Sequence, residues 1–280
     1  MAVNMFVCTA HIATDPSWFG IQSRFLKANL PNATVLAGVD SEIMSESPYE
    51  HNFAMTGEHI QRLDGLADIA VNRMATSDED VLAFLDGDAF PIRPMETYVS
   101  EKLGIEPLVA VCRDEVPDSD YPHPSFCATT VGLWKSVGGH WGFSSDDSLK
   151  RNDVGCGLRD RLREFGIEWH RMRRSNEFNP HPLLFGIYDG VLYHHGAGFR
   201  SPITSVDRIA WRGRAPEGTW SSEEKYEFFA EVLAQQNFVL SSLMKSVIDL
   251  TPDFYQIFEA ARSDEMPPPH RYPGRTTRKW

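Results

Sequence analysis

The sequence predicts an α/β protein: a Rossmann-like, mixed but mainly parallel sheet flanked by helices, with a helical appendage at the carboxyl end. Three observations predict it. Residues 3–40 alternate strand, helix and strand, a pattern that favours parallel pairing. Residues 81–85 are five consecutive apolar residues, which is typical of a strand buried on both faces. Further short strand-like runs follow along residues 108–195.

Each element is assigned from its apolar pattern and from the residues that end it. The helix over 17–30 has an apolar stripe and stops before Pro31. Apolar residues at three- and four-residue spacing predict a longer helix over 57–75. Residues 41–56 and 113–124 are expected to be loops. The expected strands are 3–9, 33–40, 81–85, 108–112, 126–134, 167–172 and 190–195, and the expected helices are 17–30, 57–75 and 152–165.

The character of the sequence changes near residue 218. Ser222 and the two acids after it indicate a helix start, and Thr251 and Pro252 indicate another, with Thr251 as the cap. Residues 264–280 contain three consecutive prolines and four basic residues, which predict a poorly ordered basic tail. The expected parts are therefore 1–217 for the main domain, 218–263 for a helical extension and 264–280 for the tail.

Composition and charge exclude some classes of protein. The net charge of −12 over 280 residues argues against a general nucleic-acid binder, because phosphate contacts need clustered cations. No apolar stretch reaches the length of a membrane span, and residues 1–8 lack the basic start of a signal peptide, so we expect a cytoplasmic protein. The four cysteines are widely spaced and are expected to be reduced core thiols.

The buried 81–85 strand ends at two carboxylates, Asp86 and Asp88, separated by Gly87. Open α/β sheets bind ligands at the carboxyl ends of their strands. Gly87 lets the backbone bend, so both acids can face one way. Adjacent carboxylates repel, and Mg²⁺ or Mn²⁺ would remove that repulsion. The alternative is a polar Asp-Gly turn; the buried strand and the following Pro91 favour a metal site.

Other strand ends and one helix supply further candidates for the same region. Thr9 and His11 lie at the end of the first expected strand. Asp40 ends the second, where it could meet a ribose or base or serve as a turn residue. Arg62, within the 57–75 helix, could approach a phosphate, and a solvated helix face is its alternative.

Two later segments complete a pattern. Residues 131–162 contain a Gly-Gly turn and then Asn152 and Asp153 before a Leu-Arg-Asp-Arg-Leu run, and residues 194–202 read His-His-Gly-Ala-Gly-Phe-Arg-Ser-Pro. Together with Asp86-Gly87-Asp88, in this order, they resemble the GT-A class of nucleotide-sugar glycosyltransferases, with family-2-like motifs, over about residues 1–202. The sequence departs from that class at Asn152, where an acid is usual, and at Ser201, where some retaining members have lysine.

The resemblance implies that the 1–217 domain transfers a sugar from a nucleoside-diphosphate sugar to a carbohydrate or other hydroxyl acceptor, with Mn²⁺ or Mg²⁺ as cofactor. Asp88 would ligate the metal directly, and Asp86 would bind it through water or contact the ribose. A histidine would complete the metal site, and the spacing to Gly198 favours His195 over His194. The donor-binding residues would be Asp86, Asp40, Thr9, His11, Arg62, Arg200 and Gly198.

By the same resemblance Asp153 would be catalytic, beneath the acceptor hydroxyl. It would act as a general base in an inverting enzyme and would only hold the acceptor in a retaining one; capping of a helix is its structural alternative. Asn152 and Trp141 would join it on the acceptor side, with Trp141 stacking on a sugar face unless it packs in the core. The 218–263 extension would shape the acceptor side, form a homodimer contact or cover the sheet.

Three other classes compete with this interpretation. A phosphatase with a nucleophilic Asp-x-Asp strand end calls for Thr or Val after the second acid, and Ala89 stands there. A sugar-nucleotide-synthesising enzyme should carry a glycine-rich, arginine-containing loop after the first strand, which residues 8–11 do not provide. A non-catalytic, metal-dependent protein that binds sugar nucleotides or carbohydrates would share the site and differ only in turnover.

Overall fold

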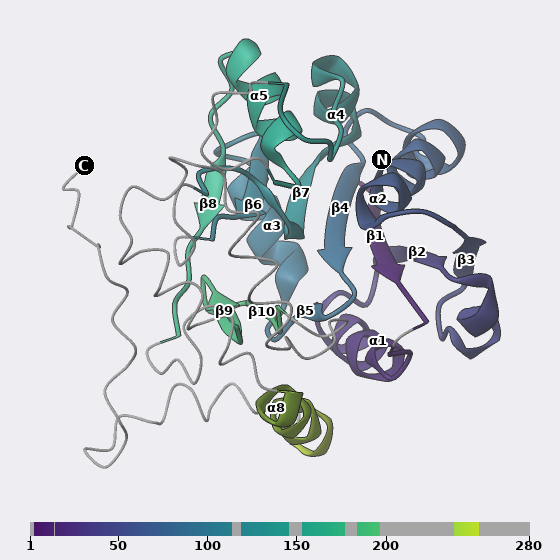
Figure 1. The fold of residues 1–280 in the computed structure, drawn as a ribbon. Helices are drawn as coiled ribbons and strands as arrows, with labels where there is room; N and C mark the ends of the chain where they lie inside the picture. The colour runs from purple at the N-terminus through teal and green to yellow at the C-terminus, as the bar shows by residue number, and fades with distance from the viewer. Residues whose placement is uncertain are drawn as a thin grey trace, which may run out of the picture.

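The computed structural model describes residues 3–13, 15–113, 119–145, 153–176, 184–196 and 238–251. At its centre is a seven-stranded sheet with the order β3-β2-β1-β4-β7-β6-β8 (Figure 1). These strands are β1 (Met5–His11), β2 (Thr34–Val39), β3 (His51–Ala54), β4 (Val81–Asp86), β6 (Leu108–Val111), β7 (His123–Thr130) and β8 (His170–Met172). All neighbours pair parallel except β7, which is antiparallel to β4 and β6. The predicted α/β class with a mixed, mainly parallel sheet is confirmed.

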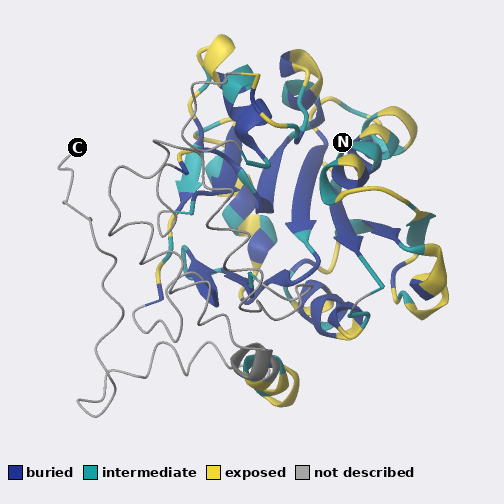
Figure 2. Ribbon diagram, in the orientation of Figure 1, coloured by how far each residue is buried: buried dark blue, intermediate teal, exposed yellow. Residues whose placement is uncertain are grey.

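Helices cover both faces of this sheet. The face that carries α1 (Trp18–Asn29) and α3 (Met95–Leu103) is opposite the face that carries α2 (His59–Ile69), α4 (Val131–Val137) and α5 (Cys156–Glu164). The alternation along β4 explains the two cores: Leu82 and Phe84 pack with the second set, and Ala83 and Leu85 with the first. Figure 2 shows the central strands buried and the outer turns of the helices exposed.

A small antiparallel sheet positions the site. It consists of β5 (Ala89–Pro91), β10 (Leu192–His194) and β9 (Gly186–Tyr188), and it lies beyond the arrowhead of β4 in Figure 1. Ala89 pairs with His194, and Pro91 pairs with Leu192. The chain therefore passes from β4 through Asp86-Gly87-Asp88 into a strand whose partner brings His194 beside the two acids.

The helix α8 (Phe238–Leu250) packs against α1 near the small sheet (Figure 1). Ile248 is fully buried in a cluster with Trp18 and Phe90, and Lys245 forms an ion pair with Asp15. The predicted helix start at Ser222, the residues after Thr251 and the tail lie outside the described residues. Thr251, the predicted cap of a helix, directly follows α8. None of the described helices has the length and apolar character that a membrane crossing requires.

Four parts of the chain differ from the sequence predictions. Residues 41–56 contain the 3-10 helix η1 (Ser41–Glu46) and β3, whose four residues are too few for an alternation to be recognised. The expected 126–134 strand ends at Thr130, because Thr130 Oγ1 accepts a hydrogen bond from Leu133 N at 3.1 Å and caps α4. The expected 57–75 helix continues after α2 as one π-helical turn, η2 (Ala70–Met74). The helix α3 was not predicted, because it buries only Met95 and Val99.

Candidate functional site

Asp86, Asp88 and His194 converge at the carboxyl end of β4. His194 Nε2 lies 3.6 Å from Asp86 Oδ2 and 3.6 Å from Asp88 Oδ1. Each residue offers one ligand atom, and these atoms all lie within 4.8 Å of one another. The side chains are 14%, 8% and 6% exposed, respectively. Two carboxylate oxygens and an imidazole nitrogen suit a divalent cation, and Mn²⁺ accepts the nitrogen more readily than Mg²⁺.

The backbone after β10 fixes the orientation of Asp88. His195 N donates to Asp88 O at 3.0 Å, and Gly196 N donates to Asp88 Oδ2 at 3.1 Å. Gly196 has φ of +83°, a conformation that favours glycine and turns its N–H toward the carboxylate. One oxygen of Asp88 is thus held by the backbone, and the other faces His194.

The structure reverses the expected order of the two histidines. The ring of His195, favoured from its spacing to Gly198, is fully buried between Trp18 and Phe185, at centroid distances of 4.7 and 4.9 Å. Its Nδ1 is hydrogen-bonded to Tyr193 Oη at 3.0 Å, and burial lowers the pKa of His195 to about 3. His194 faces the carboxylates instead, because neighbouring side chains at a strand end point to opposite sides.

His59 is a further member of the site that sequence reasoning missed. It is the first residue of α2, and its Nε2 lies 3.1 Å from Asp86 Oδ1. Burial by itself would raise the pKa of Asp86, but His59, with smaller contributions from His123 and His194, holds that pKa well below its usual range. The pKa of His59 is raised, because Asp86 outweighs the opposite effect of burial. Its only sequence signal was its place at the start of the 57–75 helix.

Asp153 lies three residues before the start of α5 and is held by Tyr121. Tyr121 Oη donates to Asp153 Oδ2 at 3.0 Å, and Val154 N donates to Asp153 Oδ1 at 2.9 Å. Gly155 has φ of +99°, and a Cβ there would lie 2.0 Å from Pro122 O. The turn that carries Asp153 can approach the 121–122 segment this closely only because residue 155 is glycine. Asn152 lies outside the described residues.

His123 lies near His194 and interacts electrostatically with both Asp86 and Asp153. Its ring centroid lies 5.7 Å from that of His194. Burial lowers the pKa of His123 well below its usual value, and the charge of Arg113 adds to this, while Asp86 and Asp153 act in the opposite direction. Ser125 N donates to His123 Nδ1 at 3.1 Å, so in the neutral ring the proton resides on Nε2.

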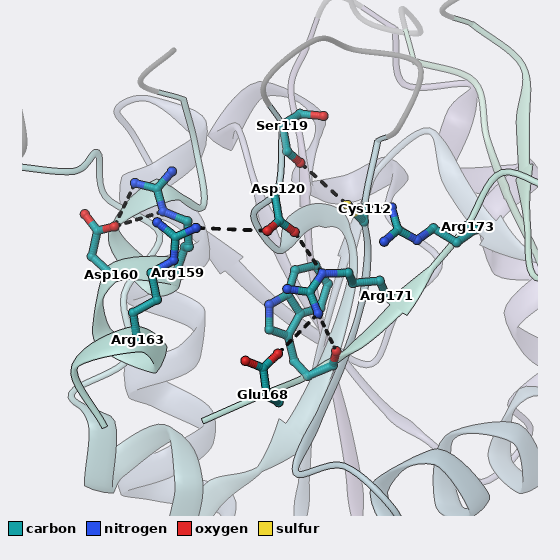
Figure 3. A network of polar contacts seen from close by, with 10 residues as sticks. Cys112, Ser119, Asp120, Arg159, Asp160, Arg163, Glu168, Arg171 and Arg173 are labelled. Carbon is teal, nitrogen blue, oxygen red and sulfur yellow. Dashed lines mark hydrogen bonds and ion pairs between the residues drawn. The ribbon is translucent and has the colours of Figure 1, made fainter. Parts of the chain in front are cut away.

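A surface network anchors the segment that carries Tyr121 and His123 (Figure 3). Arg171 Nε donates to Asp120 Oδ1 at 2.8 Å, and Arg163 Nη2 lies 4.0 Å from Asp120 Oδ2. The guanidinium of Arg171 also lies over the ring of Trp169, 4.5 Å from its centroid. Burial would raise the pKa of Asp120, but Arg171 outweighs it and the pKa is lowered. Residues 119–121 are thereby attached to β8 and α5.

Three of the expected donor-side residues have other partners. Thr9 and His11 are fully buried, and both are hydrogen-bonded to Gln22 Oε1, so they do not line an open surface. Arg62 is 6% exposed; it forms an ion pair with Asp40 and donates to His11 O at 3.2 Å. Asp40 also accepts from Ala13 N at 2.7 Å, and its side chain remains 26% exposed. Of these four residues, Asp40 is the most exposed.

Trp141 is a core residue, which corrects its expected role in acceptor stacking. Its ring is fully buried and packs edge-on against Phe84 at a centroid distance of 4.9 Å. Since no face of the indole is open, a sugar cannot stack on it. Gly198 and Arg200 lie outside the described residues.

The comparisons with known proteins concern the fold. No protein-family model and no curated protein matches the sequence. Among solved structures, the chain is similar to the glycosyltransferase GlyE of Streptococcus pneumoniae TIGR4, with 11% identity over 64% of this chain and 47% of that chain and a TM-score of 0.41. It is also similar to the galactosyltransferase LgtC in complex with donor and acceptor sugar analogs, with 11% identity over 62% of this chain and 75% of that chain and a TM-score of 0.37.

A third similar structure is the catalytic domain of Drosophila beta1,4-galactosyltransferase 7 in complex with xylobiose, with 12% identity over 61% of this chain and 65% of that chain and a TM-score of 0.37. The chain spans about half the length of the GlyE structure. At such identities the similarity concerns the arrangement of the chain alone.

Proposed function

We propose that this protein is a divalent-metal-dependent glycosyltransferase that uses a nucleoside-diphosphate sugar as donor and a hydroxyl group as acceptor. The observation that carries the proposal is the convergence of Asp86, Asp88 and His194 at the carboxyl end of β4. Departure of a nucleoside diphosphate places negative charge on the leaving oxygen, and a bound divalent cation would stabilise that charge as a Lewis acid.

The surroundings of the three side chains support different roles for the two acids. Asp88 has one oxygen held by Gly196 N and the other directed at His194, so Asp88 and His194 would hold the cation. Asp86 shares one oxygen with His59, which leaves its other oxygen, on the His194 side, for the cation or its water. Asp40, whose side chain is 26% exposed directly after β2, would face the nucleoside.

Asp153 would act on the acceptor. Its carboxylate accepts hydrogen bonds from Tyr121 and from the backbone, which keep it oriented. In an inverting transfer Asp153 would take the proton of the acceptor hydroxyl while that oxygen attacks the anomeric carbon and the bond to the diphosphate breaks. In a retaining transfer it would only hold the acceptor, and the anomeric configuration of the product distinguishes the two.

The experiment is a thermal-shift screen of nucleoside diphosphates with and without Mn²⁺. One of them should raise the melting temperature of the wild type only when the metal is present, and Asp88→Asn should abolish that rise. If no nucleoside diphosphate stabilises the protein with any divalent cation, the proposal is wrong. Metal-dependent hydrolysis of the matching sugar nucleotide then separates an enzyme from a protein that only binds it.

A further inference from the structure

The carboxamide of Gln22, on α1, contacts both ends of the Asp86-Gly87-Asp88 turn. Gln22 Nε2 donates to Asp86 O and to Ala89 O, each at 2.8 Å. The first carbonyl is at the last residue of β4, and the second is at the first residue of β5. Gln22 is fully buried. One side chain therefore joins the end of one sheet to the start of the other, across the residues that carry the two acids.

The orientation of this carboxamide is fixed by its partners. Backbone carbonyls only accept hydrogen bonds, so the nitrogen must face Asp86 and Ala89. The oxygen then accepts from Tyr49 Oη at 2.7 Å, from His11 Nε2 at 3.0 Å and from Thr9 Oγ1 at 3.1 Å. Burial lowers the pKa of His11 to about 4, so this ring is neutral and carries its proton on Nε2. Both N–H groups and the oxygen of the carboxamide are used.

The helix α1 takes the place of a neighbouring strand along β5. β5 is an edge of the small sheet, and an edge strand leaves backbone carbonyls without a strand partner. Gln22 donates to Ala89 O, and Asn29 Nδ2 donates to Pro91 O at 2.9 Å. The two amides are seven residues apart, about two turns on the same face of the helix. They bind alternate carbonyls of the strand, but only Gln22 also reaches the turn with the acids.

We infer that Gln22 is a positioning residue that sets the separation of Asp86 and Asp88 and thereby the affinity of the metal site; the inference rests on the proposed function. Gly87 leaves the turn flexible by itself. Gln22 holds it from the α1 side, and the N–H groups of His195 and Gly196 hold Asp88 from the β10 side. Outer contacts of this kind typically change metal affinity about 10–100-fold when they are removed.

Gln22→Glu tests only the two hydrogen bonds that Gln22 Nε2 donates to Asp86 O and Ala89 O. It keeps the length of the side chain and an acceptor for Thr9, His11 and Tyr49, but it places an oxygen against two carbonyl oxygens. We expect the dissociation constant of Mn²⁺, measured by titration calorimetry on the whole chain, to rise about tenfold or more. The matched control is Asn29→Asp, the same chemical change on the same helix against Pro91 O. It should leave that constant within about twofold.

Hydrogen exchange of the His195 and Gly196 amides gives a readout that needs no metal, because both donate to Asp88. Exchange at these two amides should accelerate in Gln22→Glu and stay at the wild-type rate in Asn29→Asp. If Gln22→Glu does not fold, Gln22→Asn replaces it, since it is neutral and too short to span both carbonyls.

The positioning role of Gln22 and the proposed metal dependence can be refuted separately. A folded Gln22 variant with wild-type exchange at both amides overturns the positioning role, whatever its activity. So does wild-type Mn²⁺ affinity in a folded Gln22 variant when Asp88→Asn weakens binding. If the two amides exchange faster in Gln22→Glu but the wild-type protein binds no Mn²⁺, the positioning role is retained and the proposed metal dependence is refuted.

Discussion

His59 Nε2 lies 3.1 Å from Asp86 Oδ1, so the first acid of the Asp86-Gly87-Asp88 turn already has a charge partner within the protein. The carboxylate of Asp88 instead accepts a hydrogen bond from Gly196 N at 3.1 Å and lies 3.6 Å from His194 Nε2. The two acids are therefore unequal although they are two residues apart. A cation at this site would depend more on Asp88 and His194 than on Asp86.

The first prediction concerns the two histidines. His194→Ala should weaken Mn²⁺ binding about tenfold or more, since a ligand contributes at least as much as its outer contacts. His195→Ala should instead lower the free energy of unfolding, by about 1–3 kcal/mol, because it removes a buried, hydrogen-bonded ring. Calorimetric titration with Mn²⁺ and urea unfolding measure the two effects. The reverse pattern would restore His195 as the ligand.

The second prediction concerns His59. In His59→Gln the carboxylate of Asp86 loses its nearest positive partner, so the metal-free protein should unfold at a lower temperature. Added Mn²⁺ should then raise the melting temperature by more than it does in the wild type, because the cation supplies the missing charge. A smaller metal-induced rise than in the wild type would mean that His59 supports the metal site rather than competing with it.

The third prediction concerns Asp153. If it takes the acceptor proton, Asp153→Asn should lower kcat about 100-fold or more and leave the affinity for the nucleoside diphosphate unchanged. Tyr121→Phe removes one hydrogen bond to the same carboxylate and should have a smaller effect in the same direction. Transfer assays and nucleotide titrations measure the two quantities. An equal loss of both in Asp153→Asn would remove it from the acceptor side.

The central sheet could be predicted because each of its buried strands carries a local signal. The apolar run 81–85 and the two acids after it are visible in consecutive residues, and β4 with Asp86 and Asp88 lies where that pattern placed it. The pairing of β7 against β4 could not be predicted, because strand direction in a mixed sheet depends on contacts between distant residues.

The rest of the site depends on side-chain direction and on distant contacts. A shift of one residue in the strand determines whether His194 or His195 faces the carboxylates. The spacing of the histidines to a sequence motif does not determine that shift. His59 and Gln22 reach Asp86 from helices 27 and 64 residues away in sequence, respectively. Thr9 and His11 are at a strand end, where ligand-facing residues are expected, but both are hydrogen-bonded to Gln22. Gln22 is a buried polar residue of α1, so the apolar pattern of that helix does not reveal its role.

The last prediction concerns Asp80, a buried acid just before β4. It is 1% exposed; Asn4 N donates to its Oδ1 at 3.0 Å, and Thr76 N and Ser77 N donate to its Oδ2 at 2.8 and 3.1 Å. Burial would raise the pKa of Asp80, but these backbone hydrogen bonds outweigh it and hold the pKa below the usual value of 3.8. Asp80→Asn puts an N–H group against at least one of these donors. It should lower the free energy of unfolding by about 1–3 kcal/mol at neutral pH.

The effect should depend on pH in a definite direction. Because the pKa of Asp80 is lower in the folded state than in the unfolded state, its carboxylate stabilises the fold fully above the unfolded pKa, and this contribution is lost as pH falls through the folded pKa. Urea unfolding should therefore show that the difference in free energy of unfolding between wild type and Asp80→Asn is constant near pH about 7 and becomes smaller only in acid, towards pH about 3. Asp78→Asn is the control: Asp78 is 70% exposed and pairs with Lys135 at 2.7 Å, so its loss should cost less than about 1 kcal/mol. A gap for Asp80→Asn that stayed constant into acid would mean that it reflects packing around residue 80 and not the bound carboxylate.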